Sequence, residues 1–92
     1  MYVIACYDVP AKRTEKYRKL LARYLIGIQE SVFGGDLTET QFRALQKATK
    51  RLYREDDIIT WITTENKRNI GIEHWKDGEL VQDIDHLGSS VL

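Results

Sequence analysis

The chain has 92 residues, of which 42% are hydrophobic and 30% are charged, and its formal net charge is zero. These values are ordinary for one soluble globular domain and leave no room for two independent cores. No apolar stretch reaches the ~18–20 residues that a membrane-spanning helix needs, and the first residues lack the pattern of a signal peptide. With a single cysteine, Cys6, an internal disulfide is excluded. We therefore expect a cytoplasmic protein without a membrane partner, small enough for a dimer interface to bury useful surface.

The charge is distributed unevenly along the chain. Residues 1–54 carry 11 Lys or Arg and 5 Asp or Glu, a net charge of +6, whereas residues 55–92 carry 3 and 9, a net charge of −6. Such a split is typical of a basic half that binds an anionic partner. Two halves of one fold that neutralise each other would give the same composition, so the placement in space decides between the two.

The stretch YVIACYDVP, residues 2–10, predicts a first strand over residues 2–8 that stops before Pro10. Side chains alternate between the faces of a strand. One face would hold Tyr2, Ile4, Cys6 and Asp8, and the other Val3, Ala5 and Tyr7. Both faces are mostly apolar, which predicts a central strand. Asp8 ends this strand with no second acid, histidine or cysteine beside it, so the local sequence alone supplies no catalytic set.

Two amphipathic helices are predicted, one from about residue 13 to residue 25 and one from the TETQ capping box at residues 38–41 to about residue 53. Each carries a basic stripe apart from its apolar face. The first stripe is Lys12, Lys16, Lys19 and Arg23, and the second is Arg43, Lys47, Lys50, Arg51 and Arg54. Such stripes suit a nucleic-acid backbone, although a basic stripe is also the ordinary solvated face of a helix.

Four further strands are predicted, at residues 28–33, 56–64, 70–75 and 79–85. Residues 34–36, GGD, are interpreted as a turn that uses the access of glycine to positive φ, and residues 76–78, KDG, as a tight hairpin turn. The literal order is β-α-β-α-β-β-β. A ferredoxin-like βαββαβ core needs one more strand between the helices, and residues 25–36 would supply it only as a very tight hairpin.

Three landmarks within residues 1–64 resemble the family of small CRISPR-associated adaptation proteins, also described as CRISPR-associated endoribonucleases. They are VIACYD at residues 3–8, QESVFGG at residues 29–35, similar to the family's Gln-x-Ser-Val-Phe-x-Gly stretch, and the capped helix LTETQFRALQKATKRL at residues 37–52. The resemblance implies a single α+β, ferredoxin-like βαββαβ domain over residues 1–92, with the strand before the second helix broken near Gly27. It also implies a homodimer in which an additional C-terminal strand, from residues 70–92, crosses onto the partner's sheet.

In this family the Asp that ends the first strand binds a divalent metal across the dimer two-fold, and Asp8 matches that position. The resemblance therefore implies that Asp8 is the metal ligand and the catalytic residue. Two copies near an axis would give two carboxylates, and Mg²⁺ commonly takes one or two carboxylates and keeps several waters. The alternative is an Asp8 that only caps the turn before the first helix. Ser31 and Phe33 of the matching SVF stretch could lie near the site, with a core position as the alternative for Phe33.

The resemblance places the nucleic-acid contacts just after the first strand, at Lys12, Arg13, Lys16 and Lys19. The leading hypothesis is a homodimer that bridges copies of the CRISPR integrase protein and binds pre-spacer double-stranded DNA during spacer acquisition. Its rival is a metal-dependent endonuclease that hydrolyses RNA or DNA through Asp8 of both chains. A regulatory or toxin-like domain with neither role is the third. No general base, nucleophile or transition-state cation is evident near Asp8 beyond Tyr7, Lys12 and Arg13, and Tyr7 belongs to the opposite face. This favours the first hypothesis.

Overall fold

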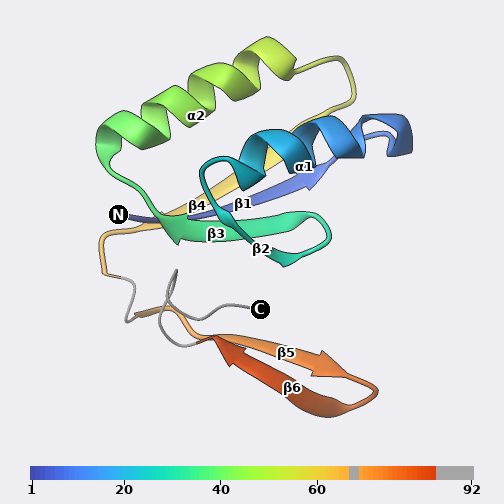
Figure 1. The fold of residues 1–92 in the computed structure, drawn as a ribbon, viewed down its shortest axis with the longest axis vertical. Helices are drawn as coiled ribbons and strands as arrows, with labels where there is room; N and C mark the ends of the chain where they lie inside the picture. The colour runs from blue at the N-terminus through green and yellow to red at the C-terminus, as the bar shows by residue number, and fades with distance from the viewer. Residues whose placement is uncertain (67–68, 85–92) are drawn as a thin grey trace.

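The computed structural model describes residues 1–66 and 69–84 of the chain (Figure 1). Its elements are β1 (Tyr2–Asp8), a 3-10 turn η1 (Ala11–Arg13), α1 (Thr14–Ala22), β2 (Ile26–Gln29), β3 (Val32–Asp36), α2 (Glu39–Leu52), β4 (Ile58–Thr64), β5 (Ile72–Lys76) and β6 (Glu79–Ile84). From β1 to β4 the order is βαββαβ. This confirms the predicted α+β, ferredoxin-like fold. Asp85 and the tail at residues 86–92, which were expected to extend the last strand and reach a dimer interface, lie outside the described residues.

The four strands of the core form one antiparallel sheet in the order β2-β3-β1-β4, with the predicted central place for β1. Both helices lie on the same side of this sheet (Figure 1). The hairpin of β5 and β6 forms a separate two-stranded sheet. No helix in the described ranges is long and apolar enough to cross a membrane.

The main core lies between the sheet and the helices. Val3 and Ala5 from β1 pack with Tyr17 and Leu21 from α1 and with Leu45 from α2, and these side chains are almost fully buried. The alternation predicted for residues 2–8 is therefore correct, since Val3 and Ala5 face the helices. Burial of each large apolar side chain of this kind contributes roughly 1.5–3 kcal/mol.

The prediction of one strand over residues 28–33 is wrong. The chain makes two strands there, β2 and β3, which reverse at Glu30 and Ser31 rather than near Gly27. This tight hairpin supplies the strand that the literal order lacked. Of the residue types that usually mark a reversal, the turn contains only Ser31, a weak signal. The apolar pattern on both sides of it therefore looks continuous in the sequence.

The interpretation of residues 34–36 as a turn is also wrong, because Gly34 and Gly35 are inside β3. Neither has a positive φ; among the described glycines, Gly78 alone does. Their lack of a side chain serves packing instead. A Cβ on Gly34 would lie 2.8 Å from Cδ1 of Ile28 and would overlap the hydroxyl of Tyr2, and a Cβ on Gly35 would lie 3.3 Å from Cδ2 of Leu25.

Two local predictions are confirmed in atomic detail. Gln41 N–H donates to the hydroxyl of Thr38 at 3.1 Å while the side-chain oxygen of Gln41 accepts from Thr38 N–H at 2.8 Å, which is the predicted capping box. At the predicted hairpin turn, Asp77 and Gly78 have φ of 56° and 82°, as a primed two-residue turn requires.

The boundaries of other elements differ from the predictions. The first helix is shorter, because the η1 turn precedes it and it ends at Ala22. The strand expected at residue 56 begins at Ile58, since Asp56 has a φ of 75° and leaves the strand conformation.

Candidate functional site

Asp8 lies at the end of β1 with its side chain exposed, on the sheet face away from the helices. A small cavity of about 190 Å³ adjoins it. The residues that line this cavity are Tyr7, Asp8, Val9, Thr14, Glu30 and Ser31. Ser31 therefore lies beside Asp8, whereas Phe33 is buried in the main core. Glu30 is a neighbour that the sequence did not indicate, because its place depends on the β2–β3 reversal.

Tyr7 connects the end of β1 to the turn between β2 and β3. Its hydroxyl donates to the backbone carbonyl of Glu30 at 3.0 Å, and its N–H donates to the carbonyl of Ser31 at 3.1 Å. The ring is buried and stacks on Tyr17, with 5.6 Å between the ring centroids, and this burial raises the pKa of the Tyr7 hydroxyl. Tyr7 is thus a core residue, as its strand face predicts, and it fixes the β2–β3 turn next to Asp8.

The donors around Asp8 fit a hard divalent cation, but one chain supplies few of them. Asp8 and Glu30 carry carboxylates, and Ser31 and Thr14 carry hydroxyls, which are the oxygen donors that Mg²⁺ prefers. In residues 1–66 and 69–84, no three His, Cys, Asp or Glu side chains are grouped as a metal site. A chelating site at Asp8 would therefore take ligands from water, from substrate or from another chain.

The sheet face that carries Asp8 is apolar and partly uncovered. Ile4 pairs with Ile62 across β1 and β4, and Asp8 pairs with Ile58. Ile58 and Ile62 are 57% and 47% exposed, respectively. The far end of the face is covered, because Ile70 packs on the small cluster that contains Tyr2. Exposed apolar surface next to a polar rim is typical of a protein interface.

Arg13 forms an internal ion pair with Asp57. Its Nε lies 3.1 and 3.0 Å from the two carboxylate oxygens of Asp57, and its terminal nitrogen donates to the carbonyl of Leu52 at 2.6 Å. The side chain of Arg13 is 15% exposed, and that of Asp57 is fully buried. Tyr17 donates its hydroxyl to the same carboxylate at 2.7 Å. Arg13 was predicted to contact DNA, but its charge is neutralised inside the protein.

The ionisation of this cluster follows from its contacts. The hydrogen bond from Arg13, with further donation from Tyr17, holds the pKa of Asp57 below its usual range. Burial, and then the hydrogen bond to Asp57, raises the pKa of Tyr17 to about 12. A deprotonated Asp57 beside a protonated Tyr17 is therefore the stable state over the neutral pH range.

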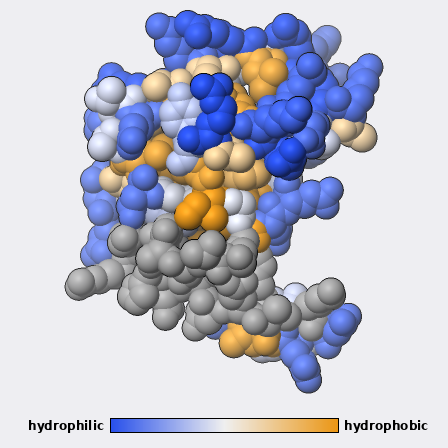
Figure 2. Space-filling view, in the orientation of Figure 1, coloured by the Kyte–Doolittle hydropathy of each residue, from blue (hydrophilic) through white to orange (hydrophobic). Residues whose placement is uncertain are grey.

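Lys12, Lys16 and Lys19, the other predicted contacts, are exposed. No ion pair in the described ranges involves them. Lys12 lies in the η1 turn just after Asp8, and the other two lie along α1. The helical side of the molecule is mostly hydrophilic (Figure 2).

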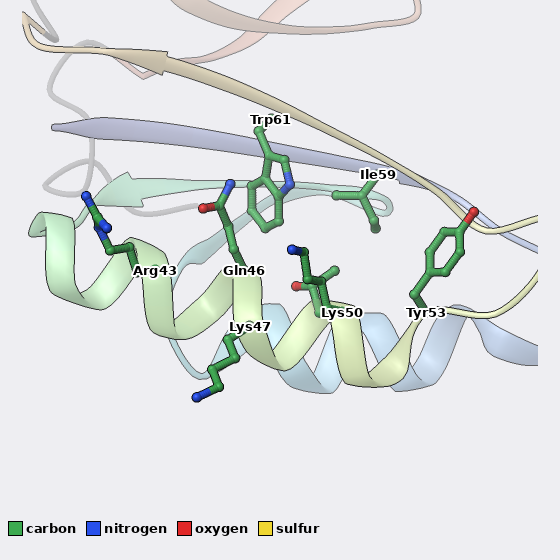
Figure 3. A pocket seen from close by; sticks show the side chains of 8 residues that line it. Arg43, Gln46, Lys47, Lys50, Tyr53, Ile59 and Trp61 are labelled. Carbon is green, nitrogen blue, oxygen red and sulfur yellow. The ribbon is translucent and has the colours of Figure 1, made fainter.

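The second basic stripe borders a different hollow, between α2 and β4, of about 600 Å³. Trp61 and Ile59 point from β4 toward α2, whereas Lys47 points away from the sheet (Figure 3). Arg43 pairs with Glu39 at 3.5 Å. Because Trp61 also makes an edge-to-face contact with Phe42, this hollow is an extension of the core surface with a basic rim.

Residues 1–70 of the chain match the family model described as CRISPR associated protein Cas2. The chain belongs to the Cas2 family. A CRISPR-associated endoribonuclease Cas2 of Methanosarcina acetivorans is 36% identical over 74 residues, which are 79% of this chain and 85% of the relative. The protein of the same name from Haloferax volcanii is 46% identical over 66 residues, 72% of this chain and 77% of the relative. The family resemblance stated from the sequence is thereby confirmed.

Solved structures agree with this assignment. A crystal structure of a Cas2 matches with a TM-score of 0.65 and 42% identity, and covers 67% of this chain and 71% of that one. The Streptococcus pyogenes Cas2 structure at pH 6.5 matches with a TM-score of 0.64 and 27% identity, over 70% of this chain and 86% of that one. The chain therefore has a CRISPR-associated role and the fold of solved Cas2 proteins.

Proposed function

We propose that this Cas2 protein works in CRISPR adaptation as a homodimer that bridges copies of the CRISPR integrase and binds pre-spacer duplex DNA. One observation carries the proposal: Asp8 is exposed at the rim of an apolar sheet face that the rest of the described chain leaves partly uncovered. A second copy packed on this face around a two-fold axis would bury Ile58 and Ile62 and would bring two Asp8 side chains to one rim.

The separate hairpin supports a strand exchange within this dimer. Within the described ranges β4 pairs with β1 alone, so its outer edge has free backbone groups. The β5–β6 hairpin forms a two-stranded sheet of its own, and two strands alone are marginally stable in water. Addition of the hairpin to the β4 edge of a partner would give the free backbone groups of β4 hydrogen-bond partners and would make the hairpin part of a larger sheet.

The metal proposed for the paired Asp8 side chains is Mg²⁺. Such an ion, when bound, neutralises a phosphate oxygen and acidifies a bound water. The role of the chain is to hold the two carboxylates, with Tyr7 and Ser31 fixing the neighbouring turn. Without a cation, two carboxylates in contact repel each other, and one of them tends to retain a proton.

A second candidate function is a metal-dependent endonuclease, acting on RNA or on DNA. The name of the similar proteins, CRISPR-associated endoribonuclease, favours it. Among the residues lining the cavity at Asp8, Glu30 is the one further carboxylate, and it is the candidate general base. The lining of the same cavity includes no histidine or lysine, which favours the bridging, DNA-binding dimer over the endonuclease.

Asp8→Ala separates the two candidates when it is measured in a spacer-acquisition assay and in a Mg²⁺-dependent cleavage assay, with gel filtration to verify the dimer. We expect acquisition to survive and any cleavage to be lost. Loss of both activities with the dimer intact would favour the enzyme. Glu55→Ala, an exposed carboxylate outside the cavity, is the matched control and should change neither. A wild-type protein inactive in both assays would overturn both candidates.

A further inference from the structure

A groove between α1 and α2 gathers basic side chains from both helices. Its volume is about 430 Å³. The cations that line it are Lys16, Lys19, Arg23 and Arg51, around the apolar side chains of Leu20, Ala48 and Leu52. The two basic stripes of the sequence therefore meet in part: three members of the first and one member of the second face a common hollow.

None of the groove cations has an ion pair among the described residues, where the ion pairs involve Arg13, Arg18 and Arg43. Glu15, whose pKa is lowered by the hydrogen bond from Arg18 and to a smaller extent by Lys19, is paired with Arg18. No Asp or Glu is among the residues that line the groove. Charges within a Debye length, about 10 Å at 0.1 M salt, act on a ligand together. The groove is consequently a site of concentrated positive potential that an anion would neutralise.

The spacing of the cations suits a linear polyanion. Lys16, Lys19 and Arg23 follow one another at i, i+3 and i+7, so they extend over about 10 Å at 1.5 Å per residue. One strand of a DNA duplex advances about 3.4 Å along the axis for each phosphate. The row can therefore lie along neighbouring phosphates of one strand, and Arg51 lines the same groove from α2.

We propose that this groove binds the phosphate backbone of one strand of duplex DNA, so that α2 shares the contact through Arg51. The inference rests on the proposed DNA-binding function, and it adds Arg23 and Arg51 to the contacts while leaving out Arg13. The lining has no aromatic side chain on which an unpaired base would stack, so the duplex backbone fits it better than a single strand does.

The test compares two double variants that remove the same charge. Arg23→Ala with Arg51→Ala removes two groove cations, and Lys47→Ala with Lys50→Ala removes two cations from the α2–β4 side that are likewise outside the ion pairs of the described residues. Fluorescence anisotropy with a labelled duplex, over a range of salt concentrations, gives the affinity and its salt slope. For the groove variant we expect an affinity loss on the order of tenfold or more at 0.1 M salt and a slope shallower by about 2. The control should stay close to wild type.

The other possible results distinguish a failure of the proposed DNA-binding function from a failure of the groove proposal. Wild-type protein that fails to bind the duplex overturns the proposed function itself. Steep, salt-dependent binding by wild type that the groove variant retains, or that both double variants lower equally, overturns this inference alone. If the groove variant instead weakens self-association in gel filtration with unchanged DNA affinity, an acidic segment of a second copy occupies the groove, which also contradicts it. Both variants alter exposed side chains, so their thermal unfolding should match that of wild type.

Discussion

Asp57 connects the segments that follow β1 and α2 to the start of β4. Its buried carboxylate accepts from Arg13, from Tyr17 and from the N–H of Arg54. These donors come from η1, from α1 and from the loop between α2 and β4, so one side chain connects three parts of the chain. Asp57 directly precedes Ile58, the residue that pairs with Asp8 across the strands. Arg13 thus ties the loop that follows Asp8 to the start of β4.

Asp57→Asn should make the protein less stable at neutral pH and less sensitive to acid. The folded pKa of Asp57 lies below the ordinary value of 3.8, so its ionised form stabilises the fold above that value. This contribution is lost as the pH falls from about 4 through the lower folded pKa. Thermal unfolding followed by circular dichroism between pH 7 and about pH 2 should show a lower Tm for Asp57→Asn at pH 7 and a smaller fall on acidification.

The neighbouring Asp56 provides the matched control for this experiment. It is exposed and has a φ of 75°, a conformation that Asn tolerates well. Asp56→Asn should therefore keep the wild-type Tm and the wild-type acid dependence. If Asp57→Asn loses stability on acidification as steeply as wild type does, the Arg13–Asp57 pair is not the group that titrates.

At the scale of elements, β3 depends on glycine for close packing. Tyr2 and Ile28 occupy the space above Gly34 that a Cβ would need, and Tyr2 is 2% exposed. Since the Tyr2 ring is held by its neighbours on the sheet face, it cannot move aside without loss of contacts. Gly27 in β2 differs, because a Cβ there would meet Cε2 of Phe33 at an ordinary 3.5 Å.

Gly34→Ala should destabilise the fold by roughly 1–3 kcal/mol, the usual cost of an overpacked site. Gly27→Ala should be neutral, or should stabilise by up to about 1 kcal/mol through the unfolded chain. Urea unfolding of both variants measures the difference in free energy. Equal stabilities for the two variants would show that Tyr2 does not need the space above Gly34.

The start of α2 and the turn between β5 and β6 were predictable because their signals are local. The capping box of α2 and the Asp77–Gly78 turn are each complete within four residues. The β2–β3 reversal was not predictable in this way, because its turn at Glu30 and Ser31 is fixed by Tyr7, 23 residues away. The place of Asp8 at the end of β1, on the face that also holds Tyr2, followed from strand alternation, whereas its exposure did not.

Whether Arg13 is free to bind a ligand likewise depends on tertiary structure. Its partner Asp57 is 44 residues away, so the sequence shows a basic residue in a basic segment and nothing of the pairing. The groove cations Arg23 and Arg51 belong to different stripes, and only the packing of α1 against α2 brings them together. For the candidate site, the sequence therefore gives residue types, and the fold decides which of them are available.

At the scale of the whole molecule, the two sides of the sheet have different roles in this account. The helical side carries the cations proposed to contact DNA, and the opposite side carries an apolar face with Asp8 at its rim. A dimer formed by the apolar faces would leave both helical sides outward. Each copy would then present one groove, which doubles the electrostatic contact with a long duplex.

In the proposed dimer a second copy completes the Asp8 site, and the stoichiometry of Mn²⁺ binding by isothermal titration calorimetry tests this most directly. We predict one ion per two chains for wild type. Ile62→Glu places a charge on the apolar face and should separate the dimer, abolishing metal binding although Asp8 is untouched. Thr63 is the next residue along β4 and is exposed on the other face. Thr63→Glu should therefore keep both the dimer and the metal binding. One ion per chain, or an undiminished affinity in monomeric Ile62→Glu, would contradict the claim.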